Sequence, residues 1–259
     1  MPKRPFYICK LEDAVLNRNI LRVTLKEKNF IKNVKLNNRG LAKDKWLELL
    51  RIGKNPSADF VKKNKKVIAD KNHPIRWVGA GSMLVLENIN HKKFIVINKR
   101  HYLSTWPNHL DVNGGYSSSV EDMLHPDRLA MRELKEEVLI KKNGKKAKIK
   151  ANVLKLSKTI TIDVSFKNRK YTTRNLILIV DADTGVIDLR QIVKMKIDDI
   201  KNYTFEDGET RFTGKYKEVS QKRKIYVIPL EKLTKMFKNG KEKFTPSLTV
   251  MIKNYAKYI

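Results

Sequence analysis

Short apolar segments rich in β-branched residues recur along the chain after residue 74 and most constrain its fold. Each has the length of an ordinary strand, and polar turns separate them. We expect strands at Gly81–Glu87, Lys93–Asn98, Ala151–Lys158, Ile160–Phe166, Asn175–Asp181 and Lys224–Pro229. Apolar residues at helical spacing predict helices at Pro126–Val138, Leu230–Lys238 and Pro246–Tyr258. Strands and helices mixed in this order favour an α/β or α+β domain built on a mixed sheet.

Three local features refine the predicted order of strands and helices. The polar residues 88–92 separate the first two predicted strands, so these strands should form a hairpin. The segment Leu110–Gly115 should form a loop that ends in consecutive glycines. Pro126 suits the first position of its helix, because its missing N–H has no partner to lose there.

The first 72 residues have a different pattern and are predicted to be a basic, partly helical N-terminal extension. Apolar residues at helical spacing predict helices over Ala42–Ile52 and Ala58–Asp70. Two short strands are expected near Phe6–Cys9 and Leu21–Leu25. Pro74 disfavours helix continuation through the residue before it, so a second domain is predicted to span residues 73–259.

The charge balance limits the partners that this chain would attract. Lysine and arginine number 56 against 27 acids, which gives a formal charge of +29. Such a protein is drawn to polyanions, namely nucleic acid, an anionic membrane surface or phosphorylated small molecules. The alternative is a codon bias that spreads lysines over a solvated surface. The basic groups lie all along the chain, which argues against one dedicated binding arm.

Cysteine content and hydropathy exclude several classes of protein. Cys9 is the single cysteine, so no internal disulfide framework or cysteine-cluster zinc site is expected. The apolar runs are far shorter than the roughly 20 residues of a membrane span. The first five residues are not followed by an apolar stretch, so a signal peptide is not expected. The sequence therefore predicts a cytoplasmic protein without a membrane partner.

Three glutamates lie close together on the predicted helix at residues 126–138. Glu133 is followed by Glu136 and Glu137, at i+3 and i+4, so the three carboxylates can face one side. Like charges at this spacing repel, and a bound divalent cation would offset the repulsion. Hard cations such as Mg²⁺ take oxygen ligands of this kind. The alternative is a solvated acidic face with Arg132 and Lys135 as counter-ions.

The segment Gly115–Ile140 resembles the Nudix box. That pattern reads Gly-x5-Glu-x7-Arg-Glu-U-x-Glu-Glu-x-Gly-U, where U is a bulky aliphatic residue. Gly115, Glu121, the run Arg132–Glu137 and Ile140 match it. Ten residues separate Glu121 from Arg132 where the pattern has seven, and Leu139 replaces the last glycine. We expect the insertion in a loop around residues 124–126, which leaves the helical glutamates in register and puts the role of Glu121 in doubt. The resemblance covers roughly residues 74–240.

The resemblance implies an α/β/α sandwich around a mixed sheet. It also implies a hydrolase that cleaves the pyrophosphate linkage of a nucleoside diphosphate derivative with Mg²⁺ or Mn²⁺. Glu133, Glu136 and Glu137 would be the metal carboxylates, and the Gly115 carbonyl a further ligand. Arg132 would orient the glutamates through charge-assisted hydrogen bonds.

Substrate recognition and the general base are less constrained. Lys99 and Arg100 are candidates to contact phosphates. Aromatic candidates for base stacking are Tyr102, Trp106 and Tyr116, although aromatic residues often only pack there. One of the helical carboxylates would take the proton of the attacking water, and Glu206 and Glu209 are alternatives, unless they belong to a simple Asp-Gly turn.

Two further functions remain open. The lysine clusters at residues 62–66 and 141–150 are compatible with RNA as a partner, and so with a decapping or 5′-end pyrophosphohydrolase. A non-catalytic, nucleic-acid-binding protein with a Nudix fold is the other alternative. A homo-oligomer, common in that family, is compatible with the extension.

Overall fold

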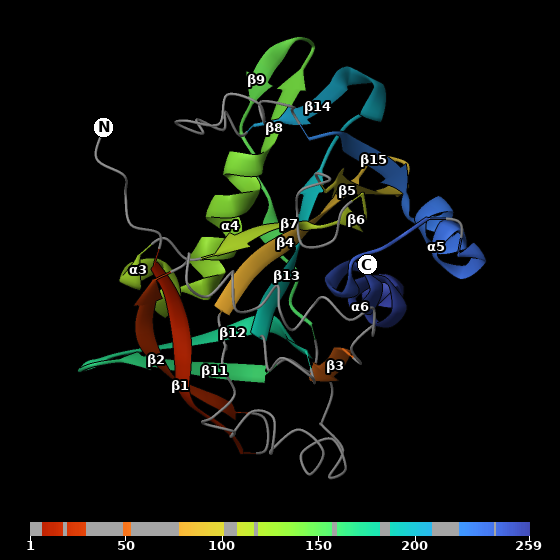
Figure 1. The fold of residues 1–259 in the computed structure, drawn as a ribbon. Coiled ribbons are helices and arrows are strands. Elements are labelled where there is room, and N and C mark those ends of the chain that lie inside the picture. The colour runs from red at the N-terminus through yellow and green to blue at the C-terminus, as the bar shows by residue number, and fades with distance from the viewer. Residues whose placement is uncertain are drawn as a thin grey trace. The chain divides into compact units, whose positions relative to one another are not determined.

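A computed structural model gives the structure of the chain. It describes residues 7–17, 20–29, 49–52, 78–100, 108–116, 119–156, 160–181, 187–208, 223–240 and 242–259. The chain divides into two compact units. The first takes residues 1–81, 115–130 and 155–191, and the second takes residues 82–114, 131–154 and 192–259. Figure 1 shows the elements in chain order by colour.

The first unit contains a mixed sheet. β1 (Tyr7–Asn17) and β2 (Ile20–Asn29) form an antiparallel hairpin. β2 then pairs in parallel with β11 (Ile160–Phe166), with Val23 opposite Val164. β11 continues antiparallel into β12 (Arg169–Asp181), which also pairs with β3 (Leu49–Ile52). The N-terminal strands therefore share a sheet with a segment more than 100 residues later in the chain.

Antiparallel pairs form the main sheet of the second unit. Residues Leu84–Glu87 of β4 (Val78–Glu87) pair with β5 (Lys93–Lys99), as the predicted hairpin requires. β5 pairs on its other side with β15 (Ile225–Pro229), while its last residues pair with β6 (Leu110–Asp111) on the side of β4. β13 (Ile187–Lys196) pairs with β10 (Asn152–Val153) through its second half. β7 (Asn113–Tyr116) follows β6.

The long helix α4 (Pro126–Glu137) runs directly into a small sheet. Strand β8 (Val138–Lys142) begins at the next residue, so no glycine exit separates helix from strand. β8 turns through Asn143 and Gly144, both at positive φ, into β9 (Lys145–Ala147). Such a two-residue turn matches the twist of a hairpin. β8 also pairs with β14 (Tyr203–Asp207), which places Asp207 opposite Val138.

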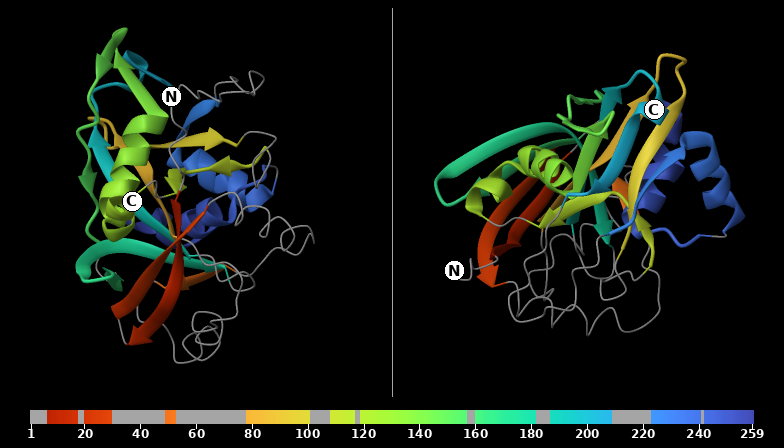
Figure 2. Two further views of the ribbon diagram at one scale, coloured as in Figure 1. Left: turned by 60° about the vertical axis from the view of Figure 1, so that its left-hand side comes forward. Right: turned by 90° about the horizontal axis from the view of Figure 1, so that it is seen from above.

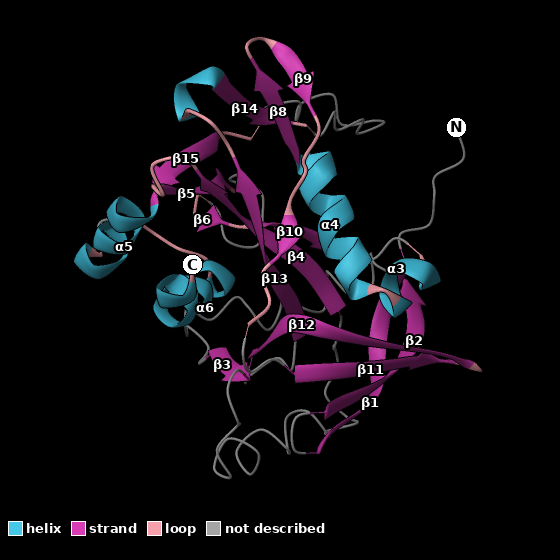
Figure 3. Cartoon of the chain, turned by 180° about the vertical axis from the view of Figure 1, so that it is seen from behind, coloured by secondary structure: helices cyan, strands magenta, loops and turns pink. Residues whose placement is uncertain are grey.

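A buried cluster joins the C-terminal half of α4 to strands of the second unit. Its members are Leu84, Leu86, Val96, Leu134, Val138, Ile140, Val193, Met195 and Ile197. Two further helices, α5 (Leu230–Asn239) and α6 (Pro246–Tyr255), lie on the other side of β5 from α4 (Figure 2). The short helices η1 (Ile200–Asn202) and η2 (Ala256–Tyr258) complete this unit. The expectation of an α+β fold with a mixed sheet is confirmed, and Figure 3 shows strands as its dominant element.

Several local predictions are confirmed. Pro126 is the first residue of α4, and the predicted helices near residues 230 and 246 are α5 and α6. The expected N-terminal strands form and are longer than predicted.

Other local predictions are wrong. The predicted helix Ala42–Ile52 fails over residues 49–52, which form β3, because pairing with β12 overrides helical spacing. The predicted loop at residues 110–115 forms two short strands, because β6 pairs with β5. Over the described residues 151–156, the predicted strand Ala151–Lys158 forms only at Asn152–Val153. The insertion before α4 is the short helix α3 (Val120–Leu124), whose N-cap Ser119 accepts a hydrogen bond from the Asp122 amide.

Some predictions concern residues outside the described ranges. They are the helix Ala58–Asp70, residues 42–48 of the other N-terminal helix and the boundary at residues 72–73.

Candidate active site

The glutamates of α4 lie opposite an apolar face that fixes the helix. Leu134 is fully buried in the core cluster of the second unit, and Met131, three residues earlier, packs against the same cluster. This apolar contact sets the rotation of the helix about its axis. Glu133 and Glu137 are nevertheless themselves buried, at 7% and 3% exposure. Buried carboxylates require partners, because an isolated charge is costly to take out of water.

Arg132 supplies the partner for two of the three glutamates. Its Nη2 lies 2.9 Å from Oε1 of Glu133, and its Nη1 lies 2.8 Å from Oε2 of Glu136. Glu136 is half exposed, so one end of this bridge faces water. Arg132 therefore contacts both carboxylates at charge-assisted hydrogen-bond distance, and its role in orienting metal ligands stays a prediction.

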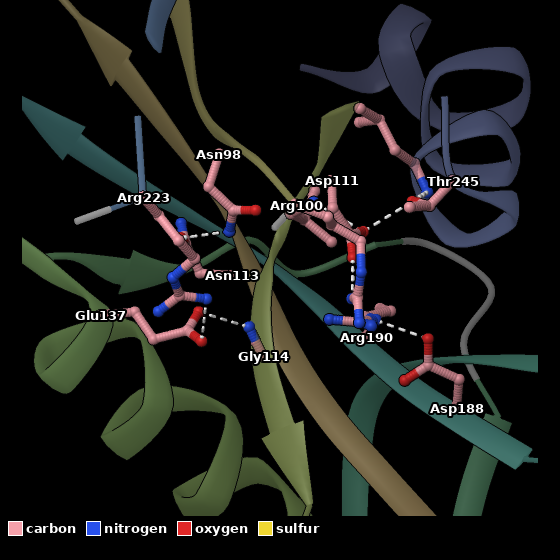
Figure 4. A network of polar contacts seen from close by, with 12 residues as sticks. Asn98, Arg100, Asp111, Asn113, Gly114, Glu137, Asp188, Arg190, Arg223 and Thr245 are labelled. Carbon is pink, nitrogen blue, oxygen red and sulfur yellow. Dashed lines mark hydrogen bonds and ion pairs between the residues drawn. The ribbon is translucent and has the colours of Figure 1, made fainter. Parts of the chain in front are cut away.

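Glu137 has a separate set of partners from distant parts of the chain (Figure 4). The Gly114 amide donates to its Oε2 at 2.8 Å. The Arg223 guanidinium donates to its Oε1 at 2.7 Å. Both oxygens of Glu137 are therefore engaged, one by Gly114 of β7 and one by Arg223, two residues before β15.

Asp207 holds Arg223 from the other side. The Arg223 backbone amide donates to Oδ2 of Asp207 at 2.6 Å, and Nη2 lies 3.5 Å from Oδ1. The adjacent Gly208 donates its amide to the Glu137 carbonyl at 3.0 Å. A Cβ at Gly208 would lie 2.4 Å from the Glu136 carbonyl oxygen, so the strand end and the helix end are in close contact.

A buried pair of asparagine side chains lies beside Gly114 at the start of β7. The Asn98 side chain donates to Oδ1 of Asn113 at 3.2 Å, and both residues are almost completely buried. This bond joins the end of β5 to the residue that precedes Gly114 (Figure 4). Loss of this bond would leave the buried Asn113 oxygen without its donor, so the bond favours one position of the Asn113 side chain.

The oxygen atoms of these side chains are of the kind that bind a hard divalent cation. Carboxylate and carbonyl oxygens are the ligands that Mg²⁺ prefers. The four carboxylates of Glu133, Glu136, Glu137 and Asp207 lie within ion-pair distance of the guanidinium groups of Arg132 and Arg223.

The described arrangement is not a preassembled metal site. Within the described ranges, no three His, Cys, Asp or Glu side chains are grouped to hold a metal ion. Two arginines separate the carboxylates into Glu133 with Glu136 and Glu137 with Asp207. The ligand roles of Glu133, Glu136, Glu137 and the Gly115 carbonyl therefore remain predictions.

The predicted phosphate contacts near β5 have protein partners. Arg100 Nη1 lies 2.7 Å from Oδ2 of the buried Asp111, and the Thr245 hydroxyl donates to Asp111 Oδ1 at 2.6 Å. Figure 4 shows this group beside α6. Lys99 ends β5, and its amide donates to the Lys224 carbonyl. Arg100 thus stabilises the junction of β6 with α6, and a phosphate-binding role would need it to leave Asp111.

Glu121, the box residue displaced by the insertion, has partners within the first unit. It forms an ion pair with Arg169, and the His125 Nε2 lies 2.7 Å from its Oε1. The hydrogen bond from Arg169 lowers the pKa of Glu121. His125 also contacts the Tyr171 ring edge-on at a centroid distance of 3.9 Å. These contacts attach α3 to β12.

The remaining candidates are partly outside the described structure. Glu206 lies on β14 rather than in the suggested Asp-Gly turn and forms a 2.7 Å ion pair with Lys141. Tyr116 ends β7, and its side chain lies outside the described part. Tyr102, Trp106 and Glu209 lie outside it altogether.

Sequence reasoning missed Arg223, Asp207, Asn98 and Gly114 as members of this site. Arg223 is separated from Glu137 by 86 residues. No periodicity or motif connects them, so only the strand order of the folded chain brings them together.

The comparisons with known proteins gave structural likeness alone. No family model matched the chain, and no curated protein did. The Nudix hydrolase RenU from M. Smegmatis is 9% identical, with 70% of this chain and 86% of that chain covered and a TM-score of 0.38. A Nudix hydrolase from Alicyclobacillus acidocaldarius is 10% identical, with 69% and 90% covered and a TM-score of 0.39.

A third solved structure is the Nudix domain of Shewanella oneidensis NrtR complexed with ADP ribose. It is 7% identical, with 71% of this chain and 90% of that chain covered and a TM-score of 0.38. These values describe a partial likeness to Nudix structures. Separately, none of the helices in the described ranges is long and apolar enough to cross a membrane.

Proposed function

We propose that this chain is a divalent-metal-dependent hydrolase of the Nudix type that cleaves the pyrophosphate linkage of a nucleoside diphosphate derivative. The observation that carries the proposal is the 2.8 Å hydrogen bond from the Gly114 amide to the Glu137 carboxylate. The bond joins Gly114, which directly precedes the box-like segment, to Glu137, the last residue of helix α4. A chance match to the box pattern would not bring these two residues into contact.

The metal would be held by Glu133, Glu136 and Glu137, with the Gly115 carbonyl as a further oxygen. When bound, a divalent cation neutralises phosphate charge and lowers the pKa of an attacking water. Arg132 keeps the Glu133 and Glu136 carboxylates in fixed positions through its two hydrogen bonds. Glu136 is the most exposed of the three, so its carboxylate is the one open to water and best placed to accept a proton.

RNA is the second candidate substrate, and one surface feature favours it. The β9 strand and the segment after it expose Lys145, Lys146, Lys148 and Lys150 on the hairpin that follows α4. A row of exposed lysines neutralises backbone phosphates without reading sequence. This favours a capped or 5′-polyphosphorylated RNA end over a free nucleotide only if the hairpin contributes to binding.

A substrate panel tests the proposal. The purified protein is incubated with Mg²⁺, with Mn²⁺ or with a chelator, and with nucleotide sugars, dinucleoside polyphosphates, ADP-ribose, nucleoside triphosphates and capped RNA. The proposal predicts cleavage of a phosphoanhydride in at least one member, abolished by the chelator. A hairpin variant with all four exposed lysines changed to glutamine should lose activity on RNA alone if RNA is the substrate.

One result of this panel would contradict the proposed hydrolase. An absence of cleavage with either metal, together with RNA affinity that falls steeply as salt rises, would replace the hydrolase by a non-catalytic nucleic-acid-binding protein.

A further inference from the structure

Arg223 is the cation that already occupies the Glu137 carboxylate. Its guanidinium and that carboxylate are 2.7 Å apart, and their side chains are only 10% and 4% exposed. At this burial the attraction is screened little by solvent. A divalent cation that binds Oε1 of Glu137 would meet the guanidinium at the same oxygen, and two cations there repel each other.

Asp207 offers Arg223 a second position. The backbone of Arg223 is fixed to Asp207 by the 2.6 Å hydrogen bond from its amide. Its guanidinium Nη2 already lies 3.5 Å from Oδ1 of the same carboxylate. A small movement of the Arg223 side chain would therefore exchange its ion pair with Glu137 for a closer one with Asp207. The guanidinium would keep a carboxylate partner throughout.

We propose that Arg223 competes with the divalent cation for Glu137, and that metal binding transfers the guanidinium from Glu137 to Asp207. Arg223 is thus a positioning residue that holds Glu137 in the metal-free protein and releases it in the metal-bound one. The inference rests on the proposed function, because it assigns a role at the same carboxylates. It assigns the ion pair of Arg223 with Glu137 to the metal-free state of the site.

Direct metal binding tests the competition. Mn²⁺ affinity is measured from the loss of the free-ion electron paramagnetic resonance signal, in the wild type, Arg223→Gln and Arg223→Lys. Removal of the competing charge should tighten Mn²⁺ binding by roughly tenfold, an ordinary coupling between two ligands. Arg223→Lys keeps the charge and should bind Mn²⁺ less tightly than Arg223→Gln. The matched control is Arg128→Gln, which removes an exposed positive charge from α4 and should leave the affinity within about twofold of wild type.

A purely structural role for Arg223 predicts the opposite sign. If the residue only supports the site, Arg223→Gln disorders Glu137 and weakens Mn²⁺ binding. Weaker or unchanged binding by a folded Arg223→Gln protein would therefore overturn the inference.

A second measurement follows Arg223 in the unaltered protein. The guanidinium signals of Arg223, assigned by their loss in a folded Arg223→Lys protein, are followed by NMR as Mg²⁺ is added. Transfer to Asp207 should shift them in step with metal binding, while the signals of the exposed Arg128 stay in place. Metal binding without a change at Arg223 would overturn the inference alone. An absence of metal binding in the wild type and both variants would remove the inference and the proposed function together.

Discussion

Glu137 and Arg223 form a buried ion pair at 2.7 Å that joins the end of helix α4 to the segment just before strand β15. Removal of one member of a buried pair leaves an uncompensated charge and costs about 3–5 kcal/mol of unfolding free energy. Substitutions of Glu137 therefore affect stability as well as chemistry. Glu136, whose side chain is half exposed, allows the chemistry to be tested with less effect on the fold.

Gly208→Ala should destabilise the protein by about 1–3 kcal/mol, because its Cβ would lie 2.4 Å from the Glu136 carbonyl oxygen. Urea unfolding measures the loss. The control is Gly240→Ala, where no atom lies within 4 Å of the new Cβ and only the positive φ of 62° opposes alanine. That change should cost about 1 kcal/mol. A Gly208→Ala protein as stable as the wild type would contradict the close contact of strand end and helix end.

Leu134→Ala should cost about 2–5 kcal/mol, because Leu134 is fully buried in the cluster beneath α4. The urea midpoint should fall while the slope of the transition stays constant. Ile89→Ala is the control, since 73% of Ile89 is exposed and the change should cost less than about 0.5 kcal/mol. Equal losses for the two variants would show that α4 does not pack through Leu134.

Thr245→Val should cost about 1–2 kcal/mol, because the hydroxyl caps α6 and donates to the buried Asp111. Thr234→Val in α5 is a matched control, because the Thr234 hydroxyl donates to the Leu230 carbonyl one turn earlier in the same helix. Its loss should be below about 0.5 kcal/mol. Thermal unfolding of the two variants in parallel gives the comparison, and similar midpoints would argue against the Asp111 bond.

Asp198 should make stability fall in acid. The hydrogen bond from Lys142, which lies 3.1 Å away, holds the pKa of this carboxyl well below its usual range. The unfolded chain then binds the proton first, so stability rises with pH through this interval. The contribution is complete above the ordinary aspartate pKa of about 3.9 and is lost as pH falls below it.

Unfolding of the wild type and Asp198→Asn between pH 7 and pH 2 checks this direction. The wild type should be the more stable at pH 7, and the difference should shrink towards pH 2. A difference that is constant with pH would exclude the ionised Asp198 as its source.

Sequence patterns predicted the helices and strands whose formation depends mainly on neighbouring residues. The hairpin β4–β5, the start of α4 at Pro126 and the helices α5 and α6 all follow from period, capping and turn chemistry. The predicted helix that includes Leu49–Ile52 failed because β12 offers those residues a strand partner. Strands β8, β9, β13 and β14 were not predicted, since their lysine-rich or mixed segments lack a clear alternation.

The candidate site shows the same division. The spacing of Glu133, Glu136 and Glu137 and the contacts of Arg132 with two of them could be predicted, because one helix carries all four residues. The partners of Glu137 could not, because Gly114 is 23 residues away and Arg223 is 86. Sequence spacing within a helix says which side chains share a face, and it says nothing about a cation that another segment supplies.

Metal-dependent turnover by Glu136→Gln tests the central claim most directly. The rate with the best substrate of the panel is measured as Mg²⁺ is varied, in the wild type, in Glu136→Gln and in Glu231→Gln, which removes an exposed acid on α5. The account predicts that Glu136→Gln folds normally and loses at least about 100-fold in turnover, while Glu231→Gln matches the wild type. Equal turnover in all three proteins would contradict a hydrolytic site on α4.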